Sequence, residues 1–428
     1  MVEYFCDTLD NGLRVVSVPM PYHHSCEVLF SIGIGSRYES RGKSGISHFL
    51  EHMLFKGTAE YPTGLALERA FESLGGSANA ATDSETTSFH SRIHPEHLGS
   101  GIALFASMLQ RPLLTDLELE RRVILEEALG DLNESGRQIN PDNIVAQLLY
   151  PNHPLGQPTV GLRHSIEKLG LAQLKSHHAI YYTPHNTVLA VAGPIDHLQV
   201  KTFANESFQN WVGDHAPLPK PWTDQFEKAP RFRWVRDAGS QVSLQCAFLM
   251  PGRNSDHAVN LRVLRRLLGW GGMSRLMLRL REELGLTYAV EAMLALYADT
   301  GVFAIDLAVS PQNISQALQA ILELFSELHQ TPVNDADLLH TLASYRYDLD
   351  YSRDQVDEMA LRYGWSELTG CKRTIEADLA ALEQVTAENL QETTRTFFTP
   401  DRLRGAVVGP YTTGQRNATE TLITAWRP

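Results

Sequence analysis

The chain has 428 residues, of which 43% are hydrophobic and 20% are charged, and this composition is typical of a folded globular protein. It excludes disordered, collagen-like and coiled-coil classes, and the length is sufficient for two or three domains. Lysine and arginine total 37 against 50 aspartate and glutamate, so the net charge is −13 at pH 7. A field of that sign disfavours nucleic acid and anionic membranes as partners.

The N-terminal segment MVEYFCDTLDNG lacks the basic and apolar regions of a secretory signal, and no run of about 18 apolar residues follows. The cysteines lie far apart without CxxC spacing, so neither a disulfide framework nor a thiolate zinc site is predicted. They are Cys6, Cys26, Cys246 and Cys371. We expect a cytoplasmic protein.

Strand-like alternation opens each half of the chain and amphipathic helical periodicity follows it. The expected strands lie at residues 13–18, 27–32 and 242–248. The expected helices lie at 45–55, 65–74, 97–109, 116–134 and 171–182, then at 258–268, 274–284 and 314–329. Because strands cluster before helices cluster, the pattern favours an α+β fold over a parallel doubly wound sheet.

The chain contains an internal repeat. Residues 181–195 (YYTPHNTVLAVAGPI) align without a gap on residues 397–411 (FFTPDRLRGAVVGPY), at an offset of 216. Residues 71–75 match residues 281–285 at an offset of 210, and each segment ends a predicted helix with glycine. Two homologous domains are the simplest interpretation.

A proline-rich segment at residues 213–230 separates the two copies. Its four prolines disfavour helix and sheet interior and stiffen the chain, which is typical of a linker. We therefore predict an N-terminal domain at 1–212 and a C-terminal domain at 231–428, each a mostly antiparallel sheet covered by helices.

The segment GISHFLEHMLFKGT contains a candidate metal site. On a helix, His48 and His52 share one face, so both imidazoles can reach one cation, and Glu51 borders the same face. The order HxxEH is the inverse of the thermolysin-type HExxH zinc motif. The spacing predicts two zinc ligands with a carboxylate beside them.

A third ligand is needed, because catalytic zinc usually takes three from the protein. In the helical run at 118–127, Glu120 and Glu127 are seven residues apart, two turns along one face. Glu126 points about 100° away from Glu127 and is the rival ligand. Three apolar residues mark the expected packed side: Leu119, Val123 and Ile124.

With these residues the chain resembles the pitrilysin-like M16 zinc peptidases, which include insulin-degrading enzyme and mitochondrial processing peptidase. The family signature HFLEHMxFKGT stands at residues 48–58, and the family's E-x6-E pair falls on Glu120 and Glu127, the latter 75 residues after His52. The resemblance implies a duplicated LuxS/metallopeptidase-like fold that forms half of a clamshell. It also implies that His48, His52 and Glu127 bind one Zn²⁺ per chain, that Glu51 is the general base, and that Glu120 orients the site.

The resemblance extends to the segment at residues 75–87, which is similar to the family's substrate-binding edge strand. It implies that Asn79 and Ala80 pair with the peptide backbone. In the second half the family's Arg and Tyr fall on Arg281 and Tyr288, and they are expected to hold the substrate carbonyl and stabilise the oxyanion. One departure is Trp270, which stands where a third glycine is common.

The second copy lacks the metal residues. The stretch that aligns with HFLEH is VLRRLLG, at residues 263–269, and the helix that matches Glu127 has Tyr-Arg-Tyr at 345–347. One metal per chain follows. We expect solvated or capping roles for the remaining histidines weighed as ligands, which lack a suitable helix or a carboxylate in register: His23, His24, His90, His94, His97, His177 and His178.

The expected function is zinc-dependent endopeptidase activity on short or unfolded peptides inside a closed dimeric chamber. A two-repeat chain is half of a chamber by the resemblance, so we expect a homodimer, and a heterodimer with a related M16 subunit stays open. Two further functions also stay open. One is a dedicated maturation peptidase for a ribosomally made peptide, acting with a partner subunit. The other is a non-catalytic core-type structural subunit, against which the intact motif argues.

Overall fold

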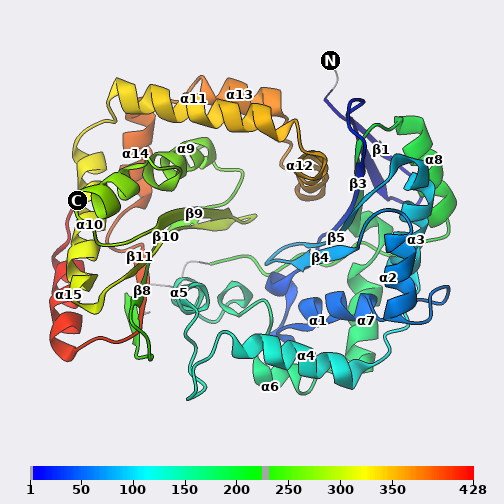
Figure 1. Ribbon diagram of the computed structural model, residues 1–428, viewed down its shortest axis with the longest axis horizontal. Helices are drawn as coiled ribbons and strands as arrows, with labels where there is room; N and C mark the ends of the chain where they lie inside the picture. Colours follow the sequence, from blue (N-terminus) through cyan, green and yellow to red (C-terminus); the bar gives the residue numbers. More distant parts are fainter. Residues whose placement is uncertain (1–2, 224–230) are drawn as a thin grey trace. The chain divides into compact units, whose positions relative to one another are not determined.

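The computed structural model describes residues 3–223 and 231–428, which form two compact units, each built on one β-sheet (Figure 1). The first unit comprises the residues up to Ala128, Gln157–Lys220 and Asp350–Ile375; the second comprises Leu129–Gly156, Pro221–Leu349 and Glu376–Pro428. Within the predicted linker, residues 213–223 form neither helix nor strand, and residues 224–230 lie outside the described residues.

The first sheet has six strands in the order β1-β2-β6-β3-β5-β4. The strands are β1 (Phe5–Thr8), β2 (Arg14–Pro19), β3 (Cys26–Ile32), β4 (Asn79–Thr82), β5 (Thr87–Ile93) and β6 (Thr187–Gly193). Only β2 and β6 are parallel, and the other neighbours are antiparallel. Strand β4 pairs with β5 alone and therefore forms one edge of this sheet.

Helices cover both faces of the first sheet. They are α1 (Ile46–Leu54), α2 (Gly64–Glu72), α3 (Leu98–Gln110), α4 (Leu117–Leu129), α6 (Arg163–Ile166), α7 (Leu171–Tyr181), α8 (His197–Phe208) and α12 (Val356–Thr369). Alternate residues of β3, such as Phe30, join the main core under α3 and α8. On the other face α12 lies close to β3 and β6, because Gly364 has no side chain to hold it away from Leu29 and Ala190.

The second sheet has five strands in the order β7-β11-β8-β10-β9. The strands are β7 (Phe232–Val235), β8 (Val242–Pro251), β9 (Val290–Leu296), β10 (Thr300–Val309) and β11 (Leu403–Val408). The accompanying helices are α5 (Pro141–Leu149), α9 (Ala258–Gly269), a π-helix (Met277–Glu283), α10 (Ile314–Gln330), α11 (Asp335–Ser352), α13 (Ile375–Leu382), α14 (Ala387–Phe397) and α15 (Thr413–Ala425). Phe248, Phe325 and Phe398 pack together in its core, with ring centres 4.7–5.1 Å apart.

The two sheets confirm the predicted duplication and the α+β fold class. Strands β2-β6-β3-β5-β4 of the first unit and β7-β11-β8-β10-β9 of the second have the same order and the same single parallel pair. Strand β6 begins at Thr187 and β11 at Leu403, at the 216-residue offset of the sequence repeat. The first unit differs by one extra edge strand, β1.

The compact units differ from the predicted halves at 1–212 and 231–428 because they exchange one helix each. Helix α12, from the second half of the sequence, covers the first sheet, and α5, from the first half, covers the second sheet. Helix α12 is held by the backbone carbonyl of Glu367, which accepts a hydrogen bond from Arg14, and by Tyr363, whose ring stacks on Tyr4 at 4.5 Å. Each sheet needs apolar cover on both faces. For one face of each sheet, this cover comes from a helix of the other sequence half: α12 for the first sheet and α5 for the second.

Two predicted helices have different limits. The helix expected at 116–134 ends at Leu129, because residues 132–138 fold back on themselves through a bridge between Leu132 and Gln138. The helix expected at 274–284 is wound as a π-helix over Met277–Glu283.

The sequence predicts neither disulfides nor membrane-spanning helices. All four cysteines are free. No helix in the described part of the chain is long and apolar enough to cross a membrane. The cytoplasmic location stays a prediction.

Candidate metal centre

The first turn of α1 is fixed by a buried carboxylate. Both oxygens of Glu39 accept backbone hydrogen bonds, from Gly45 N at 2.7 Å and Ser47 N at 2.9 Å. Burial raises the pKa of Glu39 to about 8, and the two N–H donors oppose that rise. Gly45 has φ of 90°, and a side chain there would collide with Val160 O at 2.5 Å. The start of the helix that carries the histidines is therefore held on both sides.

The two histidines of α1 turn the same nitrogen toward one point. The Nε2 atoms of His48 and His52 are 3.2 Å apart. His52 Nδ1 lies 2.8 Å from Glu120 Oε1, and since a carboxylate accepts, the proton belongs on Nδ1 and the Nε2 lone pair is free. Burial, with a smaller contribution from His52, lowers the pKa of His48 to about 4, so its imidazole is neutral at pH 7. Two lone pairs that face each other this closely fit a shared cation.

Glu127 completes the cluster from α4. Its Oε1 lies 3.6 Å from His48 Nε2 and its Oε2 lies 3.7 Å from His52 Nε2. Among the residues with described positions, His48, His52 and Glu127 are the only group of three or more potential metal ligands whose donor atoms lie within 4.8 Å of one another. Two imidazole nitrogens and one carboxylate are a catalytic zinc donor set, so these residues fit the metal that the sequence predicts. The rival ligand Glu126 is not in the group.

Glu120 supports the cluster from the same helix. It is 4% exposed and accepts a bond from His52, and its other oxygen pairs with Lys56 Nζ. A carboxylate in this position fixes the orientation of the imidazole and makes it a better ligand. The structure thus brings Glu120 to the place that the resemblance implies, although its role stays a prediction.

The predicted packed side of α4 is partly wrong. Ile124 is buried, but Leu119 is 51% exposed and Val123 is 45% exposed. Arg121 attaches the helix instead: its guanidinium donates to Leu169 O at 2.7 Å and lies 5.6 Å from the ring centre of Phe49 on α1. A cationic side chain with a long apolar stem thus contributes to the packed side of α4, whereas two of the three predicted aliphatic residues do not.

Glu51 lies beside the ligand group without belonging to it. The side chain is 8% exposed, and burial raises the pKa of its carboxyl. Thr82 opposes that rise by donating a hydrogen bond from Oγ1 to Glu51 Oε2 at 2.6 Å. A buried carboxylate next to a cation site is suited to accept a proton from water. Thr82 was not identified from the sequence.

The other predicted site residues lie in two places. Asn79 and Ala80 belong to β4, the edge strand that also carries Thr82. Arg281 and Tyr288 belong to the second unit, where the guanidinium lies 5.1 Å from the phenol ring centre and Tyr288 is 83% exposed. The structure thus brings Arg281 and Tyr288 together with each other, and the catalytic and binding roles of all four residues stay predictions.

In the second unit the helix that corresponds to α1 is α9, which carries three arginines and no His, Cys, Asp or Glu. The Arg266 guanidinium pairs with Asp348 and lies 5.1 Å from the ring centres of both Trp270 and Tyr345. Within the described residues no cluster of potential ligands lies in the second unit, and one metal per chain stays a prediction.

The remaining histidines have three kinds of environment. His94 accepts a bond from Glu96 N at 3.3 Å, as expected for a capping role, and His90 pairs with Glu27 at 2.7 Å. His177 is neither solvated nor capping: it is buried, and its Nε2 lies 3.1 Å from Ser47 Oγ. Burial lowers its pKa to about 3, so it is a neutral core residue behind α1.

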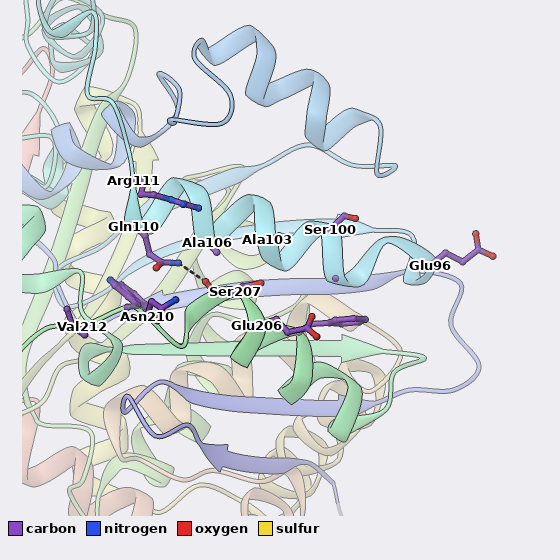
Figure 2. A pocket seen from close by; sticks show the side chains of 13 residues that line it. Glu96, Ser100, Ala103, Ala106, Gln110, Arg111, Glu206, Ser207, Asn210 and Val212 are labelled. Atoms are coloured by element: carbon purple, nitrogen blue, oxygen red, sulfur yellow. Dashed lines mark hydrogen bonds between the residues drawn. The ribbon is translucent and has the colours of Figure 1, made fainter.

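A large hollow of the first unit lies away from this cluster. It has a volume of about 1010 Å³ and lies between α3 and α8, where Gln110 Nε2 donates to Ser207 O at 3.0 Å (Figure 2). Its wall includes Ala103, Gln110 and Phe203 but none of the metal-cluster residues. The candidate reaction centre is the partly buried cluster of His48, His52 and Glu127, which lies near the edge strand, an arrangement suited to an extended substrate.

Two family models match the chain in tandem. Residues 14–162 match the model described as insulinase (peptidase family M16), and residues 168–345 match the model described as the peptidase M16 inactive domain. The chain is 32% identical over 415 residues to an uncharacterized zinc protease of Mycobacterium tuberculosis, covering 94% of this chain and 92% of the relative. It is 29% identical over 407 residues to an uncharacterized zinc protease of Bacillus subtilis, covering 92% and 95%.

Solved structures share the fold of the whole chain. A protease from Helicobacter pylori superposes with a TM-score of 0.86 at 23% identity, covering 95% of this chain and 99% of that one. The periplasmic protease PqqL from Escherichia coli superposes with a TM-score of 0.79 at 19% identity. That match covers all of this chain but 51% of PqqL, so this chain corresponds to half of the longer protein.

Proposed function

This chain belongs to the M16 (insulinase) peptidase family, and from that premise we propose that it is a zinc-dependent endopeptidase acting on short or unfolded peptides. The observation that carries the proposal is the convergence of His48 Nε2, His52 Nε2 and the Glu127 carboxylate on one point beside the buried Glu51. When bound there, Zn²⁺ supplies Lewis-acid chemistry, which lowers the pKa of a water molecule and polarises a carbonyl group.

The chain's own residues transfer the proton, orient a metal ligand and bind the peptide. Glu51 accepts the proton of the attacking water and passes it to the leaving amine, a role that suits a carboxyl whose pKa is raised by burial. Glu120 keeps the His52 proton on Nδ1, so that Nε2 remains a ligand. Asn79 and Ala80 lie on an edge strand whose backbone can pair with an extended peptide, which favours unfolded segments over folded proteins.

Digestion of a mixed peptide library, analysed by mass spectrometry, tests this function. We expect cleavage of many short peptides and no cleavage of folded proteins. A few closely related cleavage sites would instead favour a dedicated maturation peptidase. A chain that binds zinc and cleaves nothing would favour a non-catalytic core-type subunit, which the intact donor set argues against.

We further propose a homodimer in which Arg281 and Tyr288 of one chain serve the metal centre of the other. Each chain carries both parts, so two copies suffice for two complete sites under twofold symmetry. Mixing inactive Glu51→Gln with inactive Tyr288→Phe should restore about a quarter of wild-type activity, since half of the dimers are hybrids and each hybrid has one intact site.

A matched control mixes two variants whose substitutions both lie in the metal centre of the first unit. Glu51→Gln mixed with Glu127→Ala should restore nothing, because every site then contains a damaged metal centre. Failure of the first mixture after subunit exchange has been verified, for example by differential tagging, would contradict catalysis across the interface. That result would instead favour a catalytic site within one chain or a heterodimer with a related subunit.

A further inference from the structure

We propose that Thr82 is a positioning residue that fixes the Glu51 carboxylate through its hydroxyl and thereby ties the general base to the peptide-binding strand. The inference rests on the proposed function and deepens it. Its basis is one contact: Thr82 Oγ1 to Glu51 Oε2 at 2.6 Å, between an edge strand and a helix 31 residues apart in sequence. A hydrogen bond of this length to a carboxylate belongs to the strong class.

The direction of this hydrogen bond follows from the carboxylate of Glu51, which can only accept. Thr87 faces Thr82 across the β4–β5 pair, with the two Oγ1 atoms 3.3 Å apart. Thr87 is fully buried and donates its single hydrogen to Ile34 O at 2.9 Å, so it has none for Thr82. The two hydroxyls therefore have one hydrogen left between them, that of Thr82, and because a carboxylate only accepts, the short contact to Glu51 Oε2 requires Thr82 to donate it there.

The bond selects one oxygen of the base. Oε2 of Glu51 is occupied by the Thr82 hydroxyl, so the proton of the attacking water goes to Oε1. Because the carboxyl group cannot rotate without breaking a short, partly buried hydrogen bond, Oε1 is kept in one orientation. Pre-orientation of this kind is what a general base requires.

The strand that carries Thr82 is itself firmly anchored where it turns into β5. Asp83 Oδ1 accepts bonds from Glu85 N at 2.6 Å and Thr86 N at 2.7 Å. Arg37, which is 1% exposed, donates to Glu85 Oε1 at 2.6 Å, and its backbone N donates to Ser84 O at 2.8 Å. A hydroxyl at the end of a rigidly held strand can position a second group, which a hydroxyl on a loose loop cannot do.

The same strand, β4, therefore supports both the bound peptide and the general base. A peptide that adds to the free edge of β4 is aligned by the same strand whose last residue, Thr82, holds Glu51. Loss of the hydroxyl should therefore impair the chemical step while substrate binding through the strand backbone persists.

Three variants test the proposal. Thr82→Val removes the hydroxyl at nearly constant shape, Thr82→Ser retains it, and Ser88→Ala removes a hydroxyl from the adjacent strand of the same hairpin. We expect Thr82→Val to lose at least ~10-fold in kcat with KM within ~3-fold of wild type, whereas the other two variants keep kcat within ~3-fold. Zinc content should be one per chain in all of them.

A second measurement does not depend on activity. In crystals of the metal-free protein, Glu51 should have one side-chain conformation in the wild type and in Thr82→Ser, and more than one in Thr82→Val. The proposal would be overturned by a wild-type kcat in Thr82→Val, or by a loss of kcat in Thr82→Ser as large as that in Thr82→Val. A single Glu51 side-chain conformation in Thr82→Val, as in the wild type, would also overturn it. An inactive wild type would contradict the proposed peptidase function, and the crystallographic comparison would still decide whether Thr82 positions Glu51.

Discussion

Glu51→Gln should keep its zinc and lose at least ~100-fold in kcat for peptide cleavage. The reason is geometric: Glu51 lies beside the ligand group without belonging to it, so an amide leaves the donor set intact. An amide also accepts the Thr82 hydrogen bond but cannot take a proton from water. The measurement is steady-state cleavage of a peptide identified in the library digest, together with zinc content by atomic absorption.

A matched control for this variant is Glu96→Gln, the same chemical change at a side chain that is 82% exposed and outside the cluster. It should retain wild-type kcat and zinc. Full activity in Glu51→Gln would contradict the assignment of the base, and loss of zinc from that variant would show that Glu51 is a ligand.

Glu127→Ala should purify with little zinc, whereas Glu126→Ala should retain one zinc per chain. Removing one of three protein ligands leaves only the two imidazoles, and we expect the affinity for zinc to fall at least ~100-fold. The neighbouring carboxylate is the natural control, because it has the same charge on the same helix and lies outside the ligand group. Competition with a fluorescent zinc chelator measures both affinities, and the reverse pattern would reassign the ligand to Glu126.

The sequence was sufficient for the local part of the candidate site. The i,i+4 spacing of His48 and His52 on a helix, and the two-turn spacing of Glu120 and Glu127, need no knowledge of tertiary structure. The structure places these side chains together. The repeat likewise predicted two similar sheets, because a repeated sequence pattern forms the same strand order twice.

The missed features depend on contacts between segments far apart in the chain. Thr82 was unremarkable in sequence because its hydroxyl acts only once β4 lies against α1. Leu119 and Val123 were expected on the packed side of α4, yet they are exposed, and Arg121 packs against Phe49 of α1. His177 lacks any motif, and only packing behind α1 buries it.

The helix exchange was missed for a related reason. Helices α5 and α12 are both amphipathic, and either could cover either sheet as judged from hydrophobic pattern alone. Which sheet each helix covers depends on the path of the chain and on close contacts such as that of Gly364 with Ala190. Domain limits drawn from the repeat could not contain this information.

The most direct measurement of the central claim is a zinc titration of chelator-treated protein that records bound zinc and peptide cleavage together. The account predicts no cleavage without metal, and activity that rises in proportion to bound zinc and stops rising at one zinc per chain. In Glu51→Gln the same titration should show the same binding without activity. Cleavage that survives complete removal of zinc, or that requires a second zinc per chain, would contradict a single centre at His48, His52 and Glu127.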